Sequence, residues 1–375
     1  MYNQLERIRN QQAMTVTSTY KLELPKHGFL GSLLLQMQAT GVDGYGQLGG
    51  DYSLVDKISR IEVIGNGSTV IKSLTGKQLQ ALACFDQGVM PPASLRNFGA
   101  NVQFDSFLIN FGRFLYDPEM YLDLERFDNV ELWITNTGSA TTLITFVVDV
   151  IAFWQREASK AGYLGYMRSE SWKQWTTVQD EWIYNTLPTE HLVRRILLQA
   201  IPAVGATFIN ACQVKDLMYD IKLSLETGRL NIYDGGMKEL FYENYLDMGK
   251  VLLRSGFNYN FADCAYDVEL GIVLGGSAVQ ASASGATTAV SACLTANNDF
   301  PSQYAQAYLA NFMTEFIYSG IAPFKTALFR FDHDLNPATW LNTNLRKSVN
   351  LDIHTRNAAS AAAGQNHIVL DRLVK

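Results

Sequence analysis

An internal repeat restricts the fold of this 375-residue sequence more than any other feature. Three groups of residues recur in the same order in both halves. In the first, Leu24-Pro25-Lys-His-Gly28 corresponds to Ile201-Pro202-Ala-Val-Gly205. The other groups pair Gly67, Ile71, Lys77 and Leu79 with Gly228, Ile232, Lys238 and Leu240, and Phe104, Leu108, Phe111, Val130, Leu132 and Ile134 with Phe324, Leu328, Phe331, Val349, Leu351 and Ile353. The preserved order indicates that one structural unit is present twice.

The repeated unit is predicted to consist of β-strands. From Thr15 onward, short runs rich in β-branched and aromatic residues alternate with Gly, Asn, Asp and Pro. Two such runs flank Asn66-Gly67, a pair that tolerates the positive φ angles of a two-residue hairpin turn. Helical patterns are few: Gly76 to Phe85, Met237 to Met248 and Gln303 to Ile317. Because a parallel α/β fold needs a helix after nearly every strand, the pattern indicates an all-β protein of sandwiches or closed rolls.

The repeat also predicts the domain organisation. We expect an N-terminal arm over residues 1–15, where Leu5 and Ile8 have helical spacing, followed by one β unit over 16–190 and a second over 191–375. The offsets between the repeated groups are unequal, which indicates insertions. Residues 275–298 are rich in Gly, Ala, Ser and Thr and are therefore predicted to be an exposed loop insertion in the second unit.

Composition excludes several classes of function. The formal net charge is -6 and no block of Lys or Arg occurs, so direct binding to nucleic acid is not expected. No secretory signal is recognisable at the N-terminus, and the most apolar run, Thr141 to Trp154, is too short for a transmembrane helix. Hydrophobic residues make up 47% of the chain and charged residues only 18%, which favours a protein whose surface is covered by neighbours.

Residues capable of chemistry are present but do not form a recognisable site. Thr75-Gly76-Lys77-Gln78 lacks the remaining positions of a phosphate-binding loop and is predicted to start a helix. Asp332-His333-Asp334 offers three potential metal ligands, but alternate side chains of an extended segment diverge, so we expect a solvated turn. The four cysteines occur singly and are predicted to be small buried residues: Cys84, Cys212, Cys264 and Cys293. No catalytic, cofactor-binding or metal-binding residues are therefore assigned, and no cofactor is expected.

Three tryptophans leave an alternative open. Trp172, Trp175 and Trp182 lie close together in sequence, near the expected boundary between the two units. Packing between domains is the favoured interpretation. Exposed aromatic side chains can also stack on sugars, so a two-domain β-sandwich carbohydrate-binding module is an alternative. A jelly-roll enzyme of the cupin type is a third hypothesis and would require histidines and carboxylates to converge in space.

Several segments resemble the double jelly-roll major capsid proteins of tailless icosahedral, membrane-containing viruses, a lineage that includes phages, archaeal viruses and, more distantly, the adenovirus hexon. The resemblance rests on strand and turn patterns: Leu22-Glu-Leu-Pro-Lys-His-Gly-Phe-Leu30, Ile61-Glu-Val-Ile-Gly-Asn-Gly67, Val70-Ile-Lys-Ser-Leu-Thr-Gly-Lys-Gln-Leu79 and Leu225-Glu-Thr-Gly228. It implies two tandem eight-stranded antiparallel jelly rolls with short helices in the connecting loops.

The resemblance also implies a function. It implies a viral major capsid protein, not an enzyme, whose homotrimers form pseudo-hexagonal capsomers that tile an icosahedral shell. The implied partners are neighbouring capsomers, penton and minor capsid proteins, and an internal membrane reached through the N-terminal arm. The implied location is the virion capsid, after synthesis in the host cytoplasm.

Overall fold

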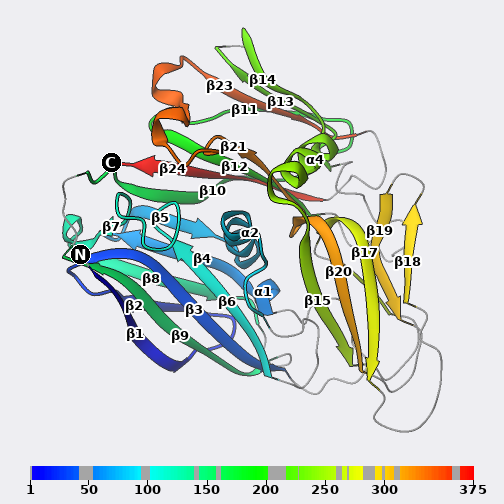
Figure 1. Ribbon diagram of the computed structural model, residues 1–375, viewed down its shortest axis with the longest axis horizontal. Helices are drawn as coiled ribbons and strands as arrows, with labels where there is room; N and C mark the ends of the chain where they lie inside the picture. The colour runs from blue at the N-terminus through cyan, green and yellow to red at the C-terminus, as the bar shows by residue number, and fades with distance from the viewer. Residues whose placement is uncertain are drawn as a thin grey trace. The chain divides into compact units, whose positions relative to one another are not determined.

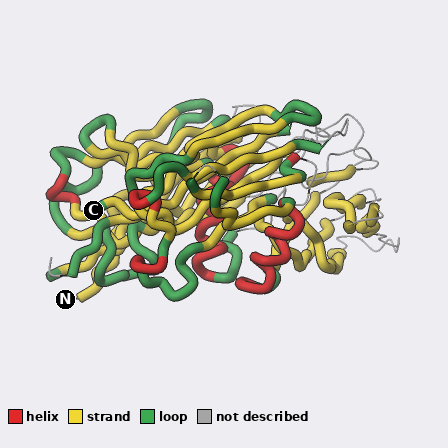
Figure 2. Tube along the Cα trace, turned by 90° about the horizontal axis from the view of Figure 1, so that it is seen from above, coloured by secondary structure: helices red, strands yellow, loops and turns green. Residues whose placement is uncertain are grey.

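The structure is a computed structural model. It describes residues 2–41, 54–93, 102–138, 143–157, 162–201, 217–226, 228–258, 264–267, 270–281, 292–297, 300–307, 313–356 and 364–375. The chain divides into two compact units, and most of the described trace is strand (Figure 2). One unit comprises Met1–Leu164 and Lys250–Pro323, and the other comprises Gly165–Gly249 and Phe324–Lys375.

The N-terminal unit contains a roll of two antiparallel sheets (Figure 1). One sheet has the order β1-β9-β3-β6, with β7 also paired to β3, and consists of β1 (Tyr2–Ala13), β9 (Leu143–Arg156), β3 (Phe29–Gly41), β6 (Val102–Asn110) and β7 (Leu122–Asp123). The other contains the neighbours β2-β8-β4-β5: β2 (Thr19–Glu23), β8 (Val130–Asn136), β4 (Ile58–Gly65) and β5 (Thr69–Leu74). In β8, Val130, Leu132 and Ile134 are buried while the residues between them are half-buried, as the alternation of a strand requires.

Short helices lie in the connections of this roll: α1 (Leu54–Lys57), α2 (Gly76–Gln87) and the 3-10 helix η1 (Leu124–Arg126). The start of α2 is set by a capping box, in which Thr75 accepts from the backbone N–H of Gln78 while the Gln78 side chain accepts from the N–H of Thr75. Gly88, with a φ of 71°, ends the helix in the left-handed region. The helix start predicted at Thr75 to Gln78 is therefore confirmed.

The C-terminal unit repeats the same strand order. One sheet contains the neighbours β10-β24-β12-β21, with β22 also paired to β12: β10 (Tyr166–Thr176), β24 (Gln365–Val374), β12 (Leu192–Ile201), β21 (Thr326–Arg330) and β22 (Leu341–Asn342). The other has the order β11-β23-β13-β14: β11 (Trp182–Thr186), β23 (Val349–His354), β13 (Asp220–Leu225) and β14 (Leu230–Gly235). Helix α4 (Met237–Met248) follows β14, as α2 follows β5, and the 3-10 helices are η3 (Pro337–Thr339) and η4 (Thr343–Leu345). The two rolls thus have identical connectivity.

Individual hydrogen bonds repeat as well. The backbone N–H of Leu24 donates to Val130, and that of Leu187 donates to Val349, each over 2.8 Å. The first pair of repeated groups was therefore wrongly aligned, because the counterpart of Leu24-Pro25 is Leu187-Pro188. Ile201 ends β12, which corresponds to β3 and not to β2. The other repeated groups fall on equivalent elements, except that Phe104 lies within β6 whereas its counterpart Phe324 lies in the turn before β21.

The structure divides the chain at positions other than those expected. The expectation of a helical arm over 1–15 is wrong for the described residues, because Tyr2–Ala13 forms β1 and pairs antiparallel with β9. Within the span expected for the first roll, 16–190, β10 and β11 pair with β24 and β23 and thus belong to the second roll. The second roll starts near Gly165 and not at 191. Both errors have one cause: each roll begins with a strand rich in polar residues, which does not show the apolar alternation of a core strand.

A strand-rich insertion separates α4 from β21. It consists of the sheets β15-β20-β17 and β16-β19-β18, formed by β15 (Val251–Asn258), β20 (Met313–Pro323), β17 (Leu270–Ala281), β16 (Cys264–Asp267), β19 (Phe300–Ala307) and β18 (Ala292–Asn297). The helix predicted over Gln303 to Ile317 is wrong, because residues 303–307 belong to β19 and residues 313–317 to β20, where cross-strand pairing overrides local propensity. Within the predicted loop at 275–298, residues 275–281 belong to β17 and 292–297 to β18, and the others lie outside the described residues.

Candidate functional site

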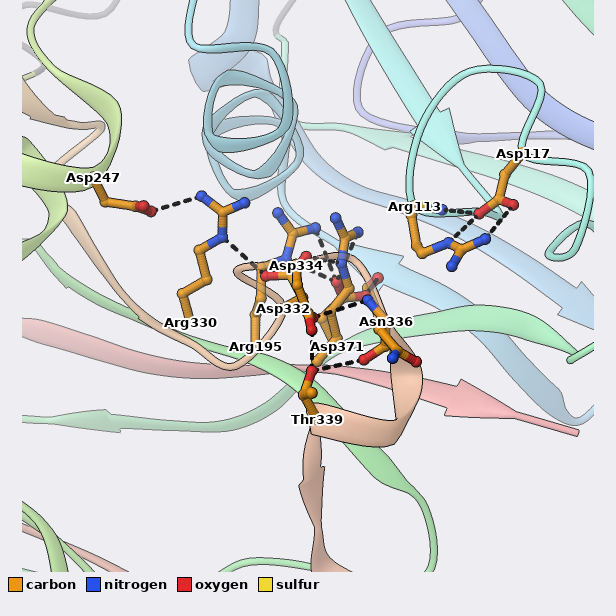
Figure 3. A network of polar contacts seen from close by, with 12 residues as sticks. Arg113, Asp117, Arg195, Asp247, Arg330, Asp332, Asp334, Asn336, Thr339 and Asp371 are labelled. Carbon is orange, nitrogen blue, oxygen red and sulfur yellow. Dashed lines mark hydrogen bonds and ion pairs between the residues drawn. The ribbon is translucent and has the colours of Figure 1, made fainter.

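The C-terminal roll contains a buried cluster of ion pairs around Asp332, directly after β21 (Figure 3). The Asp332 side chain accepts hydrogen bonds from the Nε of Arg194 at 2.5 Å and from the Nε of Arg330 at 3.0 Å. Arg330 also donates through Nη1 to Asp247 on α4 at 2.6 Å. Burial by itself raises the pKa of Asp332, but the charges of Arg194, Arg195 and Arg330 outweigh it and hold that pKa below its ordinary value.

A β-bulge in β12 positions two arginines of this cluster, Arg194 and Arg195. Val193 is opposite Arg372 and Arg195 is opposite Asp371, so Arg194 is the extra residue of β12. Asp371 accepts from the Nε and Nη2 of Arg195 at 3.0 and 2.9 Å, and the Nη1 of Arg194 lies 3.7 Å away. Arg194 therefore binds Asp332 and Arg195 binds Asp371, which links β12 to the loop after β21 and to β24.

The N-terminal roll has a bulge at the same place in β3, where the extra residue is Gly31. The backbone N–H of Phe111 donates to Gly31 at 3.0 Å, just as that of Phe331 donates to Arg194 at 3.1 Å. Here the loop after β6 forms its own ion pair: the Nε and Nη2 of Arg113 bind both oxygens of the buried Asp117 at 2.7 and 2.8 Å (Figure 3). Each cluster thus stabilises a loop, and its carboxylates are held by guanidinium groups.

Asp332-His333-Asp334 does form a turn, since the backbone N–H of Leu335 donates to the backbone carbonyl of Asp332 at 3.0 Å. The expectation of a solvated turn is confirmed for His333 and Asp334, which are exposed, and wrong for Asp332, which has no exposed side-chain surface. Asp334 accepts instead from Thr339 Oγ1 at 2.7 Å. Across the described part of the chain, no three His, Cys, Asp or Glu side chains converge as a metal site.

The three tryptophans do not form one platform. Trp172 and Trp175 lie on β10, whereas Trp182 lies on β11, in the other sheet of the roll. Trp182 instead stacks on His354, with ring centroids 4.7 Å apart, and His354 also lies 3.2 Å from the carboxylates of Asp180 and Asp220. A joint carbohydrate-binding surface of all three tryptophans is therefore not supported.

A groove of about 420 Å³ lies between β14, α4 and β21, and it is lined by Ile232, Tyr233, Glu243, Phe329, Arg330, Phe331, His333, Asp334 and Thr339. Two of its polar side chains, Tyr233 and Arg330, are bound to groups outside the lining. Tyr233 donates its hydroxyl proton to the carbonyl of Gly236 at 2.7 Å, and burial is the main reason that its pKa is raised. Arg330 is held by Asp332 and Asp247. This arrangement offers apolar surface for contact, and the Thr339 hydroxyl in its lining donates to Asp334 within the exposed turn after β21.

The remaining expectations concern cysteines and membrane spans. Cys84 is buried, which confirms the expectation of a small buried residue, and burial raises the pKa of its thiol to about 12. Cys212 lies outside the described residues, and the structure does not describe the side chains of Cys264 and Cys293. No helix in the described ranges combines the length and apolarity needed to span a bilayer.

A second charged cluster, which contains Arg168, Glu170 and Arg372, shifts the pKa of His191. Glu170 accepts from Nη2 of Arg168 at 2.7 Å and from Nη2 of the buried Arg372. Burial, followed by the positive charges of Arg372 and Arg168, lowers the pKa of His191 from 6.5, and the nearby Glu190 and Glu170 oppose this only in part. The folded protein thus keeps this imidazole neutral over a range in which the unfolded chain protonates it.

We therefore predict that stability decreases as the pH falls below roughly 6.5, where the unfolded chain binds a proton that the folded chain does not. His191→Gln removes this contribution. Urea unfolding at about pH 8 and about pH 5 is expected to show a smaller loss of stability for the variant than for the natural protein. Equal losses in the two proteins would contradict the assignment.

With the geometry established, comparison with solved structures defines the class of fold. The chain is similar to the MCP (major capsid protein) of STIV, the Sulfolobus Turreted Icosahedral Virus, with a TM-score of 0.61 at 10% sequence identity. The match covers 100% of this chain and 97% of that chain. The major capsid protein P2 of bacteriophage PM2 gives a TM-score of 0.53 at 8% identity, covering 100% of this chain and 98% of that one. The PBCV-1 virus capsid gives 0.55 at 10% identity, covering 99% and 93%.

The chain therefore has the double jelly-roll fold. No protein-family model matches the sequence, and a search of curated proteins finds no match. At identities of 8 to 10%, the structural likeness establishes the fold and leaves function to be argued separately.

Proposed function

We propose that this protein is a major capsid protein that assembles through homotrimers into an icosahedral viral shell. The observation that carries the proposal is the tandem pair of rolls with identical connectivity, at nearly full length agreement with viral capsid chains. Three copies of a chain with two equivalent rolls place six similar units around a centre, which gives a capsomer of nearly hexagonal outline.

The chemistry of the described residues supports a structural role. Three buried carboxylates of the two rolls, Asp117, Asp332 and Asp371, are bound by arginines. We therefore propose that the chain is not an enzyme. Its partners would be neighbouring capsomers and the penton and minor capsid proteins, and its location the virion, after synthesis in the host cytoplasm. We propose that contact with an internal membrane is made by the N-terminal segment, which forms strand β1.

The proposal is tested by measuring the mass of the purified full chain in solution. Size-exclusion chromatography with light scattering is expected to give three times the mass of one chain, and negative-stain electron microscopy is expected to show particles of hexagonal outline. A strict monomer at high protein concentration in both measurements would overturn the proposal.

A further inference from the structure

The two rolls have the same connectivity, but equivalent strands are buried to different extents. In the N-terminal roll, β5 is half-buried at its first two positions and buried at the other four, and Ile71 has no exposed surface. Its counterpart β14 is mostly exposed. The residue that corresponds to Ile71, Ile232, is 39% exposed, and Leu230 is 52% exposed. The C-terminal roll therefore leaves apolar side chains uncovered on a strand that is covered in the N-terminal roll.

The opposite difference occurs at the first strand of each roll. Strand β10 of the C-terminal roll begins with the buried Tyr166 and Met167. Strand β1 of the N-terminal roll is mostly exposed, including Tyr2 at 55% and Leu5 at 60%. Each roll thus has one strand that is more exposed than its counterpart in the other roll. This strand is β1 in the N-terminal roll and β14 in the C-terminal roll.

Both uncovered strands lie at the edge of their sheets. Strand β1 ends the order β1-β9-β3-β6, and β14 ends the order β11-β23-β13-β14. Edge strands present backbone N–H and C=O groups that can pair with another chain. The register of β1 is regular from Tyr2 to Arg7 and is interrupted by a bulge between Arg7 and Arg9. The regular segment is thus six residues long, the same length as β14.

Charge also distinguishes the two edges. On β1, Arg7 and Arg9 are exposed. On β14, the Asp234 side chain is 66% exposed, with Lys222 at 3.8 Å as its ion-pair partner. Because such an exposed pair is weak, Asp234 can turn to a new cation at little cost. Apolar surface on both strands and opposite charges at one end make the two edges complementary.

We propose that the edge of β14 in one copy of this chain packs against the edge of β1 in a second copy. This inference rests on the proposed assembly and names the strands that form it. Since β1 and β14 lie on different rolls, the contact is head to tail, and such a contact closes a ring when repeated through the right angle. Parallel pairing over six residues would then cover Tyr2 and Leu5 together with Leu230 and Ile232 and bring Arg7 near Asp234.

The test uses two variants of the full chain, each altered on one edge only. Leu5→Glu with Arg7→Glu changes β1, and Leu230→Glu with Ile232→Glu changes β14. Each variant alone is expected to need roughly 100-fold or more higher concentration to assemble than the natural protein, because charges are placed where apolar surface must be buried. Mixed together, they are expected to form pairs of one chain each, since only one intact contact remains, and no closed ring.

Matched controls use exposed positions away from both edges. Lys26→Glu reverses a charge next to β2, and Leu345→Glu adds a charge on the 78% exposed Leu345 of η4. Both are expected to assemble like the natural protein, and circular dichroism checks that all variants fold. Two edge variants that still assemble normally, or that form no pair when mixed, would overturn the inference while leaving the proposed function intact. A natural protein that stays monomeric would instead overturn both.

Discussion

Replacing Asp332 with alanine is expected to lower the free energy of unfolding by about 3 kcal/mol. The side chain is fully buried and accepts from Arg194 at 2.5 Å and Arg330 at 3.0 Å, so its removal leaves a buried guanidinium without its main partner. We choose the lower end of the range for broken buried pairs because Asp371 remains 3.7 Å from Arg194 and partly compensates its charge. Urea or guanidinium unfolding followed by circular dichroism measures the change.

The matched control is Asp128→Ala, since Asp128 is an exposed aspartate in the N-terminal roll. It is expected to change stability by less than about 0.5 kcal/mol. The natural protein should also lose stability in acid, because a carboxylate whose folded pKa is lowered stabilises the fold above its unfolded pKa, and this contribution disappears as the pH falls through the folded value. If Asp332→Ala were as stable as the control, the cluster would contribute nothing to the fold.

The second large effect is expected at Gly165, just before β10. Its φ is 130°, and a Cβ atom added there would lie 2.0 Å from the carbonyl oxygen of Val374. Because that atom belongs to the backbone of β24, neither side can move without breaking the pairing of Tyr166 with Val374. Gly165→Ala should therefore destabilise the protein by about 3 kcal/mol or more, the sum of backbone strain and overpacking.

Gly162→Ala provides the comparison, because Gly162 also has a positive φ, 86°, but nothing lies within 4 Å of an added Cβ. Only the conformational cost remains, and the expected loss is about 1 kcal/mol. Thermal unfolding of the two variants side by side separates the two effects. Equal losses would show that the close approach of Val374 does not constrain Gly165.

Local signals in the sequence predicted the parts of the fold that depend on turns and helix starts. Asn66-Gly67 marks the β4–β5 hairpin, and Gly228 marks its counterpart between β13 and β14. Both glycines have positive φ angles, 69° and 85°. Such residues are restricted by backbone conformation, so they remain recognisable in both copies of a repeat.

Two features could not be predicted from such local signals: the counterpart of Leu24-Pro25 and the strand conformation of β1. In the C-terminal roll an X-Pro pair occurs at the end of both β11 and β12, so Ile201-Pro202 was a false match for Leu24-Pro25. Strand β1 carries Leu5 and Ile8 among polar residues, which fits a helical spacing as well as an exposed edge strand. Only the pairing with β9, whose residues lie far along the chain, decides between them.

The ion-pair clusters depend on contacts that a single sequence does not show. Arg194 and Asp332 are 138 residues apart, and Arg195 and Asp371 are 176 residues apart. One signal was present, since two consecutive arginines interrupt the mostly apolar run of β12 from Leu192 to Ile201. Charged residues in a buried strand require partners, so these arginines could have been recognised as halves of buried pairs.

The insertion between α4 and β21 leaves and rejoins the chain at neighbouring points. Its first and last strands pair with each other, with Val251 opposite Gly320 at their base. A segment anchored this way resembles a stem, whose far end can gain, lose or exchange residues without a change in the distance between its two attachment points. Foreign peptides displayed on the chain would therefore be best placed at that far end, where the sheets of neither roll have to adapt.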